Sequence, residues 1–453
     1  MRSRQSPSPP LPHHWIGVWK GWQHFSASLS DALVVLTPAQ LATHALVIGS
    51  SGSGKTNLLT HIIAMALRWG LSLVIIDPRG DFCLSCLELC ARFGIGPAKI
   101  RFFDLRDKKN PWGFNPLVGS GEVHQRVLSV LGAIEAQAEA SGVQWPETLR
   151  NALMLLAEAG LSLVHLEAVF YSPNLRRQLI ERCKSESVRG FWERYGALSL
   201  DKQATLAQPV MNKISLLLAA ESIRRTFGQS EPVNLKSQLD MPGSVTLFSM
   251  AVDELHGAGR AAGSMFLSAV KQEVFARINT PESDRNPVLL VADEFHGQDM
   301  ESFESILAET RKFKLAAVMA HQTISQLSPK LKSLVLGNVG VKAVFRVAHQ
   351  DADVLNKDLG VAKGTFDLGR LPVGEAVLWR KGDQPWPVEI NAPLIRDVGR
   401  LSPKARRLLE LLEEFKPTFH MEQFENAEDN TACSPKQERR QSRNPQSDLE
   451  DWL

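Results

Sequence analysis

A glycine- and serine-rich stretch, Gly49-Ser-Ser-Gly-Ser-Gly-Lys-Thr56, constrains this chain more than any other feature. It matches the pattern G-x-x-x-x-G-K-[ST] in full, and the apolar runs on its two sides predict a short buried strand (44–48) and a helix (57–67). A strand, a glycine turn and a helix start present several backbone N–H groups and a positive helix end to one phosphate group. The sequence therefore predicts a P-loop that binds a nucleoside triphosphate, and we expect ATP.

The residues of this stretch have separate expected roles. Lys55 is expected to reach the β- and γ-phosphates, and the Thr56 hydroxyl is expected to hold Mg²⁺. The alternative is a Gly/Ser-rich turn that precedes Lys-Thr by chance, and the correct flanks on both sides argue against it. The candidate nucleotide-binding residues are Gly49, Ser50, Ser51, Gly52, Ser53, Gly54, Lys55, Thr56 and Asn57.

A second apolar run, Val288–Ala292, leads directly into Asp293 and Glu294. A strand that ends in this way would deliver Asp293 to the magnesium ion. Glu294 would polarise a water molecule for attack on the γ-phosphate, so it is a candidate catalytic residue. Acidic residues often end strands, but together with the P-loop the pair predicts an NTPase that hydrolyses its nucleotide.

Two further candidate catalytic residues follow in the chain. Gln322 stands at the carboxyl end of the strand predicted at 315–320, where a polar side chain can sense the γ-phosphate. Arg311 stands near the end of a helix predicted at 303–312. In a ring of subunits Arg311 could act as an arginine finger on the neighbour's ATP. An exposed cation that satisfies the helix dipole is the equally weighted alternative.

The order of apolar patterns predicts an α/β protein with an inserted all-α domain and disordered ends. We expect a disordered tail (1–14), the first part of the P-loop NTPase domain (15–120), an all-helical insertion (121–237), the second part of the NTPase domain (238–416) and a disordered acidic tail (417–453). Basic clusters within the insertion are read as a solvated helix face rather than a DNA grip.

The composition excludes little. The 453 residues carry a formal net charge of +2, which is compatible with both nucleic-acid and protein partners. The longest apolar runs are far shorter than the roughly 20 residues that span a bilayer, so we expect no transmembrane segment and a soluble, cytoplasmic protein. Cys83, Cys86 and Cys90 invite a metal-cluster interpretation, but their spacing also fits one buried helix face, which we favour.

Taken in order, these segments resemble the TraG/TraD-type coupling ATPases of conjugation and type IV secretion, within the wider group of HerA- and FtsK-like ring motors. The resemblance rests on the segment 44–56, on Ile76-Asp-Pro-Arg-Gly-Asp81, on Asn115-Pro-Leu117, on Asp293-Glu-Phe295, on Arg311 with Gln322 and Leu327, and on Asn338–Arg346 with Asp351-Ala352. Only the P-loop is specific by itself, and the ordered series carries the resemblance.

The resemblance implies a RecA-like core, a homo-hexameric ring and ATP-driven movement of DNA through a central pore. It also implies a relaxase or a secretion-channel protein as a partner. Two departures limit these expectations. Coupling proteins of this family usually carry N-terminal membrane helices, which the sequence lacks, and Arg79 stands where the family commonly has lysine. We therefore expect either a cytoplasmic location or peripheral association with the inner membrane.

Overall fold

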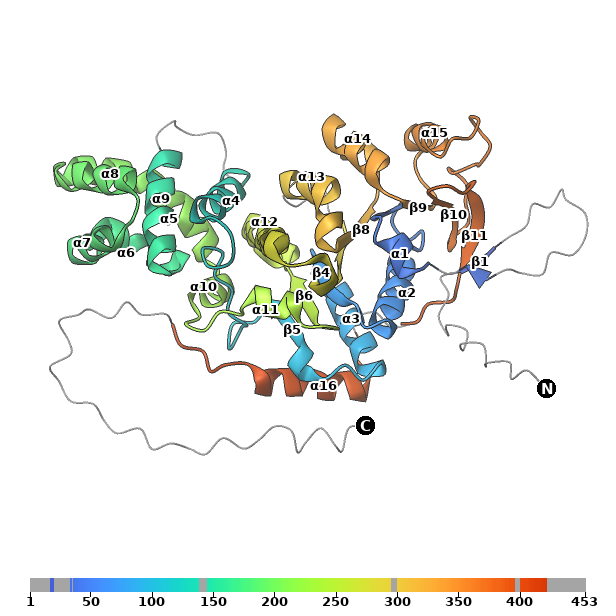
Figure 1. Ribbon diagram of the computed structural model, residues 1–453, viewed down its shortest axis with the longest axis horizontal. Helices are drawn as coiled ribbons and strands as arrows, with labels where there is room; N and C mark the ends of the chain where they lie inside the picture. The colour runs from blue at the N-terminus through green and yellow to red at the C-terminus, as the bar shows by residue number, and fades with distance from the viewer. Residues whose placement is uncertain are drawn as a thin grey trace, which may run out of the picture.

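The computed structural model describes residues 17–19, 33–34, 36–137, 145–294, 300–395 and 400–421. The tail expected at 1–14 and nearly all of that expected at 417–453 lie outside the described residues, as does Phe295. The described chain forms one large sheet with helices on both faces (Figure 1). The predicted α/β class is confirmed.

The sheet has the strand order β2-β1-β11-β10-β9-β3-β8-β7-β4-β6-β5. From β9 to β5 neighbouring strands run parallel, whereas β10, β11, β1 and β2 extend the β9 edge in antiparallel pairs. The strands are β1 Gly17–Trp19, β2 Leu33–Val34, β3 Ala45–Ile48, β4 Ser72–Asp77, β5 Ile100–Asp104, β6 Val245–Ser249, β7 Val288–Ala292, β8 Leu315–His321, β9 Val341–Val344, β10 Glu375–Arg380 and β11 Trp386–Ile390.

The central strands are buried along their whole length, which explains why they read as continuous apolar runs rather than as alternating ones. In β4, Leu73 and Ile75 join the core on one face of the sheet, and Val74 and Ile76 join the core on the other. The helices on the first face are α2 Lys55–Arg68, α3 Asp81–Arg92 and α16 Pro403–Phe415. Those on the second face include α12 Val252–Phe275, α13 Met300–Glu309, α14 Pro329–Asn338 and α15 His349–Asp358.

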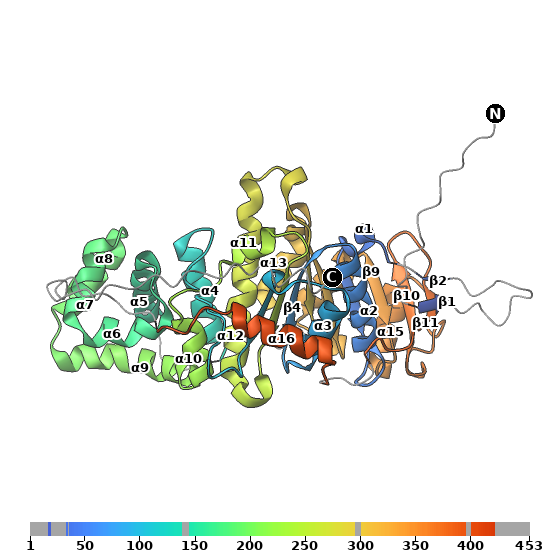
Figure 2. The same cartoon turned by 90° about the horizontal axis from the view of Figure 1, so that it is seen from below.

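Between β5 and β6 the described regular elements are helices. Most of them project from the sheet as a lobe (Figures 1 and 2), whereas the last, Leu235–Asp240, lies beside the sheet, where Gln238 donates to the Lys99 carbonyl. Phe114, which follows β5, joins the lobe to the core: its ring centroid lies 6.0 Å from that of Phe227 in the lobe and 5.4 Å from that of Phe266 in α12. The helices are α4 Val123–Glu135, α5 Trp145–Ala159, α6 Leu166–Tyr171, α7 Pro173–Arg182, α8 Glu186–Gly196, α9 Leu200–Leu218, α10 Glu221–Gly228 and α11 Leu235–Asp240. A short helix, α1 Pro38–Leu41, precedes β3.

The strand order decides where the functional loops meet. The strands β3, β8, β7 and β4 are consecutive neighbours and parallel, so their carboxyl ends share one edge of the sheet. In sheets of this kind ligands bind outside the carboxyl ends of the strands. The P-loop follows β3, and the segments that begin at Pro78, Asp293 and Gln322 follow β4, β7 and β8.

Candidate functional site

The P-loop runs from the carboxyl end of β3 into α2, which begins at Lys55. Gly52 and Gly54 have φ values of +71° and +115°, which favour glycine over residues with a side chain. A Cβ at Gly49 would stand 2.5 Å from the Cβ of Phe345, so a side chain has no room there. The three glycines of the motif are thus explained by backbone conformation and close packing.

Backbone hydrogen bonds fix this loop between the neighbouring strands. The N–H of Gly49 donates to the carbonyl of His321 at 3.1 Å, and that of Ser50 donates to the carbonyl of Arg346 at 2.7 Å. The Ser53 carbonyl accepts from Gly374, which precedes β10, at 3.0 Å. The loop is therefore held by β8 and by the residues next to β9 and β10, in addition to the hydrogen bonds within the loop itself.

A cavity of about 400 Å³ opens at this edge of the sheet, and we call it the carboxyl-edge cavity. It brings together most of the predicted site residues from three separate loops. Its lining residues are Ser51, Gly52, Gly54, Lys55, Thr56, Asn57, Asp77, Pro78, Arg79, Asp81, Phe82, Asp293, Glu294 and Gln322. Of the predicted nucleotide-binding residues, Gly49, Ser50 and Ser53 are absent from the lining. The Asn57 amide donates to the Asn391 carbonyl at 2.8 Å and so ties α2 to the segment after β11.

The Lys55 side chain folds back into the loop. Its Nζ donates to the carbonyls of Gly49 at 2.6 Å and Ser50 at 3.0 Å. Burial lowers the pKa of Lys55, while the nearby carboxylates of Asp293 and Glu294 oppose that shift. The ammonium group can exchange these carbonyl partners for a phosphate oxygen that enters the cavity, because a hydrogen bond between two charged groups is stronger.

Asp293 and Glu294 follow β7 and differ in their environments. Burial, together with the charges of Asp77 and Glu294, raises the pKa of Asp293 to about 6, although Lys55 opposes the shift. Glu294 has a left-handed backbone with φ +48°, and its N–H donates to Asp293 Oδ1 at 3.1 Å. Such a conformation is unfavourable for a residue with a side chain, and it persists where the surroundings impose it.

Gln322 reaches Glu294 from the adjacent strand. Its Nε2 donates to Glu294 Oε1 at 2.5 Å. The turn after Gln322 is held by Asp351, a buried carboxylate at the start of α15. Asp351 accepts from the Ile324 N–H at 3.0 Å and from the hydroxyls of Thr323 and Ser325. This side of the cavity therefore rests on α15.

The turn after β4 supplies a wall of the cavity, and its residues are not among the predicted site residues. Asp77 Oδ1 accepts from the Arg79 N–H and Oδ2 accepts from the Cys83 N–H, each at 2.9 Å, so Asp77 shapes the turn into α3. Arg79 is exposed, and it lines the cavity together with Asp81 and Phe82. The available signal was a buried strand that ends in a polar turn, but its proximity to the P-loop depends on strand order.

Arg311 lies at the opposite edge of the sheet. It belongs to a 3₁₀ turn, Thr310–Phe313, that precedes β8, so the helix predicted to extend to residue 312 ends at Glu309 instead. Since β8 has seven residues, roughly 20 Å of strand separates Arg311 from the turn that carries Gln322. Arg311 is exposed and lines a second cavity of about 390 Å³ beside α1 and the amino ends of β7 and β8.

The cysteine triplet lies within α3. Cys83, Cys86 and Cys90 are free and buried in the core on the α2 face of the sheet. Burial is the largest cause that raises the pKa of each thiol, to about 12 for Cys90. Within the described ranges no group of three or more potential metal-binding side chains occurs. These cysteines pack as small apolar side chains.

Comparison with known proteins places this geometry in context. The model of the helicase HerA central domain matches residues 29–106, which include the P-loop and the turn after β4. No protein of curated function matches the chain significantly. Over the part of the chain that the structure describes, no helix has the combination of length and apolar character needed to cross a bilayer.

Three solved structures share the fold. The unbound bacterial conjugative coupling protein TrwBdeltaN70 is 17% identical with a TM-score of 0.55, over 88% of this chain and 97% of that one. The plasmid coupling protein TrwB in complex with ADP and Mg²⁺ is 20% identical with a TM-score of 0.54, over 82% and 90%. VirB4 of Thermoanaerobacter pseudethanolicus is 16% identical with a TM-score of 0.53, over 88% and 99%.

These identities are low, and what they establish is a common architecture. The resemblance to coupling ATPases expected from the sequence is confirmed at the level of the fold, which is that of a P-loop NTPase similar to TrwB and VirB4.

Proposed function

We propose that this protein is a ring-forming ATPase that moves or couples DNA during conjugative or type IV secretion-like transfer, or in related DNA processing. The observation that carries the proposal is the convergence of Lys55, Asp293 and Glu294 on the carboxyl-edge cavity, with Gln322 bonded to Glu294. A P-loop amine, a metal-binding carboxylate and a second carboxylate beside it are the parts that nucleotide hydrolysis requires.

The first step is binding of ATP to the P-loop. When the triphosphate binds, the Nζ of Lys55 exchanges its hydrogen bonds to the Gly49 and Ser50 carbonyls for bonds to phosphate oxygens. The N–H groups at the start of α2 donate to the same phosphates. Asp293 and the exposed hydroxyl of Thr56 line the same cavity and offer the oxygen ligands that Mg²⁺ prefers. Magnesium, when bound, neutralises charge that develops on the phosphate oxygens.

The second step is hydrolysis. A water molecule attacks the γ-phosphorus, the bond from this phosphorus to the β–γ bridging oxygen breaks, and ADP departs. Glu294 receives a proton from the attacking water, which makes it the catalytic base. Gln322 must release or rearrange its bond to Glu294 for this role, so Gln322 links the state of the site to β8 and to α15 beyond it.

The position of Arg311 supports assembly of several subunits into a ring. Because this side chain lies at the amino edge of the sheet, far from the carboxyl-edge cavity of its own subunit, an arginine finger at this position would serve the ATP site of another subunit. A closed ring, expected to be a homo-hexamer, brings the amino edge of one subunit to the carboxyl edge of the next. An arginine finger supplied in this way accelerates hydrolysis by about 10³–10⁵ in enzymes that use one.

The comparisons support the nucleotide and the biological setting. TrwB is described as a conjugative coupling protein, and it has been solved with ADP and Mg²⁺ and with non-hydrolysable analogues of GTP and of ATP. We assign ATP to this chain, and competition by GTP tests the assignment. Partnership with a relaxase or a secretion-channel protein and a cytoplasmic location, with or without peripheral contact to the inner membrane, remain predictions.

Steady-state ATP hydrolysis tests the proposal. Purified protein is assayed alone, with single-stranded DNA and with double-stranded DNA, and Lys55→Ala serves as the blank. We expect DNA to stimulate a turnover that the blank lacks. Slow turnover that is indifferent to both DNA forms would contradict the proposal. It would favour a nucleotide-dependent module that recruits a relaxase or an effector protein without moving DNA.

A further inference from the structure

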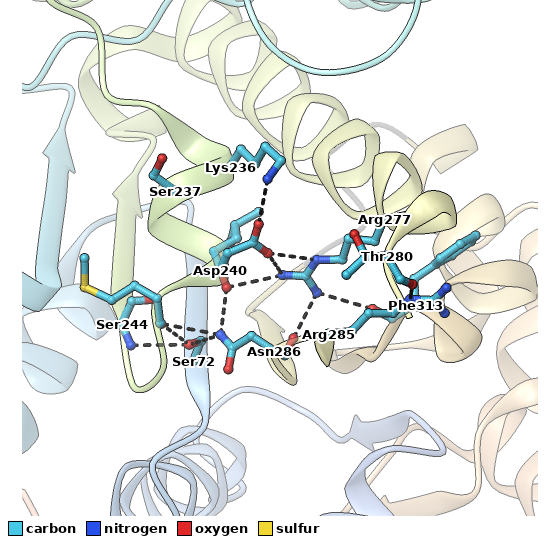
Figure 3. A network of polar contacts seen from close by, with 12 residues as sticks. Ser72, Lys236, Ser237, Asp240, Ser244, Arg277, Thr280, Arg285, Asn286 and Phe313 are labelled. Carbon is cyan, nitrogen blue, oxygen red and sulfur yellow. Dashed lines mark hydrogen bonds and ion pairs between the residues drawn. The ribbon is translucent and has the colours of Figure 1, made fainter. Parts of the chain in front are cut away.

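A network of polar contacts lies at the amino edge of the sheet, near the turn that carries Arg311 (Figure 3). Its centre is Arg277, whose side chain is only 4% exposed. The guanidinium group donates to Asp240 Oδ1 at 2.8 Å, to the Asn286 carbonyl at 2.9 Å and to the Phe313 carbonyl at 3.3 Å. Arg277 thus joins the ends of α11 and α12 to the residues before β7 and to the last residue of the 3₁₀ turn.

A second arginine, Arg285, is hydrogen-bonded to the same turn. Arg285 Nη1 donates to the Lys312 carbonyl at 2.5 Å, and its Nε donates to the Thr280 carbonyl at 2.9 Å. Its guanidinium lies 5.3 Å from the centre of the Phe313 ring, which is buried and packs edge-on against Phe275. In Figure 3 Arg277 and Arg285 approach Phe313 from neighbouring segments.

The turn itself leaves little freedom. The Thr310 hydroxyl donates to the Ile306 carbonyl at 2.7 Å and lies 3.2 Å from that of Leu315. Lys314 closes the turn in a left-handed conformation with φ +59°, and its N–H donates to the Arg311 carbonyl at 3.1 Å. Arg311 therefore has an exposed side chain, and hydrogen bonds of Thr310 and Lys314 hold the backbone before and after it. None of the carboxylates that the structure describes forms an ion pair with it.

We propose that Arg285 and Arg277 are positioning residues for Arg311, and that they hold the Thr310–Phe313 turn so that Arg311 reaches the nucleotide of the neighbouring subunit. This inference rests on the proposed function. Stabilisation of the γ-phosphate by an arginine requires placement of the guanidinium within about 0.5 Å. Misplacement by about 1 Å can lower a rate about 10²-fold. A flexible exposed arginine meets that demand only if its backbone is fixed.

Substitution of Arg285 is the better test, because this side chain is half-buried and its loss should destabilise the fold less. Loss of Arg277 would instead leave Asp240 without its buried partner. Arg285→Ala should lower DNA-stimulated kcat about ten- to a hundredfold and leave the Kd for ATP unchanged. Arg285→Lys should recover part of the loss, since lysine can donate to the Lys312 carbonyl but lacks the planar fork. Arg407→Ala, which removes an exposed arginine of α16, is the matched control and should retain wild-type turnover.

Two further measurements separate positioning from a general loss of structure. The double variant Arg285→Ala/Arg311→Ala should be no slower than Arg311→Ala alone, because both changes remove the same interaction. Addition of Lys55→Ala subunits, which cannot hydrolyse ATP but carry an intact turn, should raise the turnover of each Arg285→Ala subunit in mixed rings. Such rescue requires that the defect act on a neighbour's site.

The outcomes are distinguishable. Normal turnover in Arg285→Ala beside a large loss in Arg311→Ala would overturn this inference and leave the proposed function intact. The inference would also be overturned if the double variant turned over ATP more slowly than Arg311→Ala alone, or if Lys55→Ala subunits failed to raise the turnover of Arg285→Ala subunits. Wild-type turnover in Arg311→Ala would remove the trans-acting arginine and this inference with it. A wild-type protein without ATP turnover would overturn both the inference and the proposed function.

Discussion

The Nε2 of Gln322 donates to Glu294 Oε1 at 2.5 Å, and this bond joins the carboxyl ends of the neighbouring strands β8 and β7. The proposed catalytic base is thus held by a side chain from another strand. Because the N–H of Glu294 also donates to Asp293 Oδ1, this residue is held at both its backbone and its side chain. Hydrolysis by the proposed mechanism depends on this pair of side chains.

Glu294→Gln should retain ATP binding and lose turnover. The amide has nearly the same shape as the carboxylate but cannot accept a proton from water, so we expect kcat to fall about 10²–10⁴-fold. Binding of a fluorescent ATP analogue and steady-state hydrolysis, measured on one preparation, check the two parts. Near-normal turnover would remove Glu294 from its role.

Gln322→Ala should separate hydrolysis from its control. The substitution frees Glu294 from its amide partner and cuts the connection to β8, so we expect DNA to lose most of its stimulatory effect while the Kd for ATP stays the same. The ratio of turnover with DNA to turnover without DNA is the measurement. An unchanged ratio would show that Gln322 does not couple the two.

Asp293→Asn should abolish magnesium-dependent turnover and stabilise the nucleotide-free protein above pH 6. A carboxyl whose pKa is raised to about 6 in the folded state is ionised there at a free-energy cost. In the unfolded chain the same carboxyl has a pKa of about 4. The free energy of unfolding is therefore highest below about pH 4, where the carboxyl is protonated in both states, and it falls as the pH rises through 6 and the folded protein must ionise this group. The asparagine avoids this loss, so we expect a gain of about 1–3 kcal/mol at pH 8.

Urea unfolding at pH 8 and pH 5 in the absence of nucleotide and metal checks this prediction. The advantage of Asp293→Asn should narrow at pH 5, where the wild-type carboxyl is partly protonated in the folded protein. If the wild type were as stable as Asp293→Asn at pH 8, or more stable, the raised pKa assigned to Asp293 would be contradicted.

Asp351→Ala should destabilise the protein and disturb the Gln322 turn. The change leaves the Ile324 N–H and the Thr323 and Ser325 hydroxyls without their buried acceptor, and a loss of about 2–4 kcal/mol is expected. Asp353→Ala, on the same helix, removes only an exposed pair with Lys363 and should leave the urea midpoint unchanged. Equal effects of the two changes would refute a special role for Asp351.

The sequence predicted much of this site because its parts are local. The P-loop, Asp293 with Glu294, and Gln322 each follow an apolar run, and parallel strands bring their carboxyl ends to one edge. The segment 76–81 contributed to the resemblance, but Asp77, Arg79 and Phe82 were not predicted as site residues, because their closeness to the P-loop depends on β4 lying beside β7. That neighbour relationship is set by the packing of the whole sheet and has no signal within either strand.

Long-range contacts account for the other differences. The network of Arg277, Asp240 and Asn286 joins three segments, and no spacing in the sequence relates them. The antiparallel extension through β10, β11 and β1 pairs residues from the two ends of the chain. The end of α13 at Glu309 reflects the hydrogen bonds of Thr310 and the left-handed Lys314, which override a periodic pattern that continues through residue 312.

Displacement of streptavidin from biotinylated oligonucleotides measures whether the protein moves along DNA. Single-stranded and double-stranded DNA carrying the biotin at either end are incubated with the protein, ATP and excess free biotin. We predict ATP-dependent displacement by the wild type from at least one strand form, and none by Lys55→Ala or Glu294→Gln. DNA-stimulated hydrolysis without displacement from any of these substrates would contradict the motor and favour nucleotide-dependent recruitment.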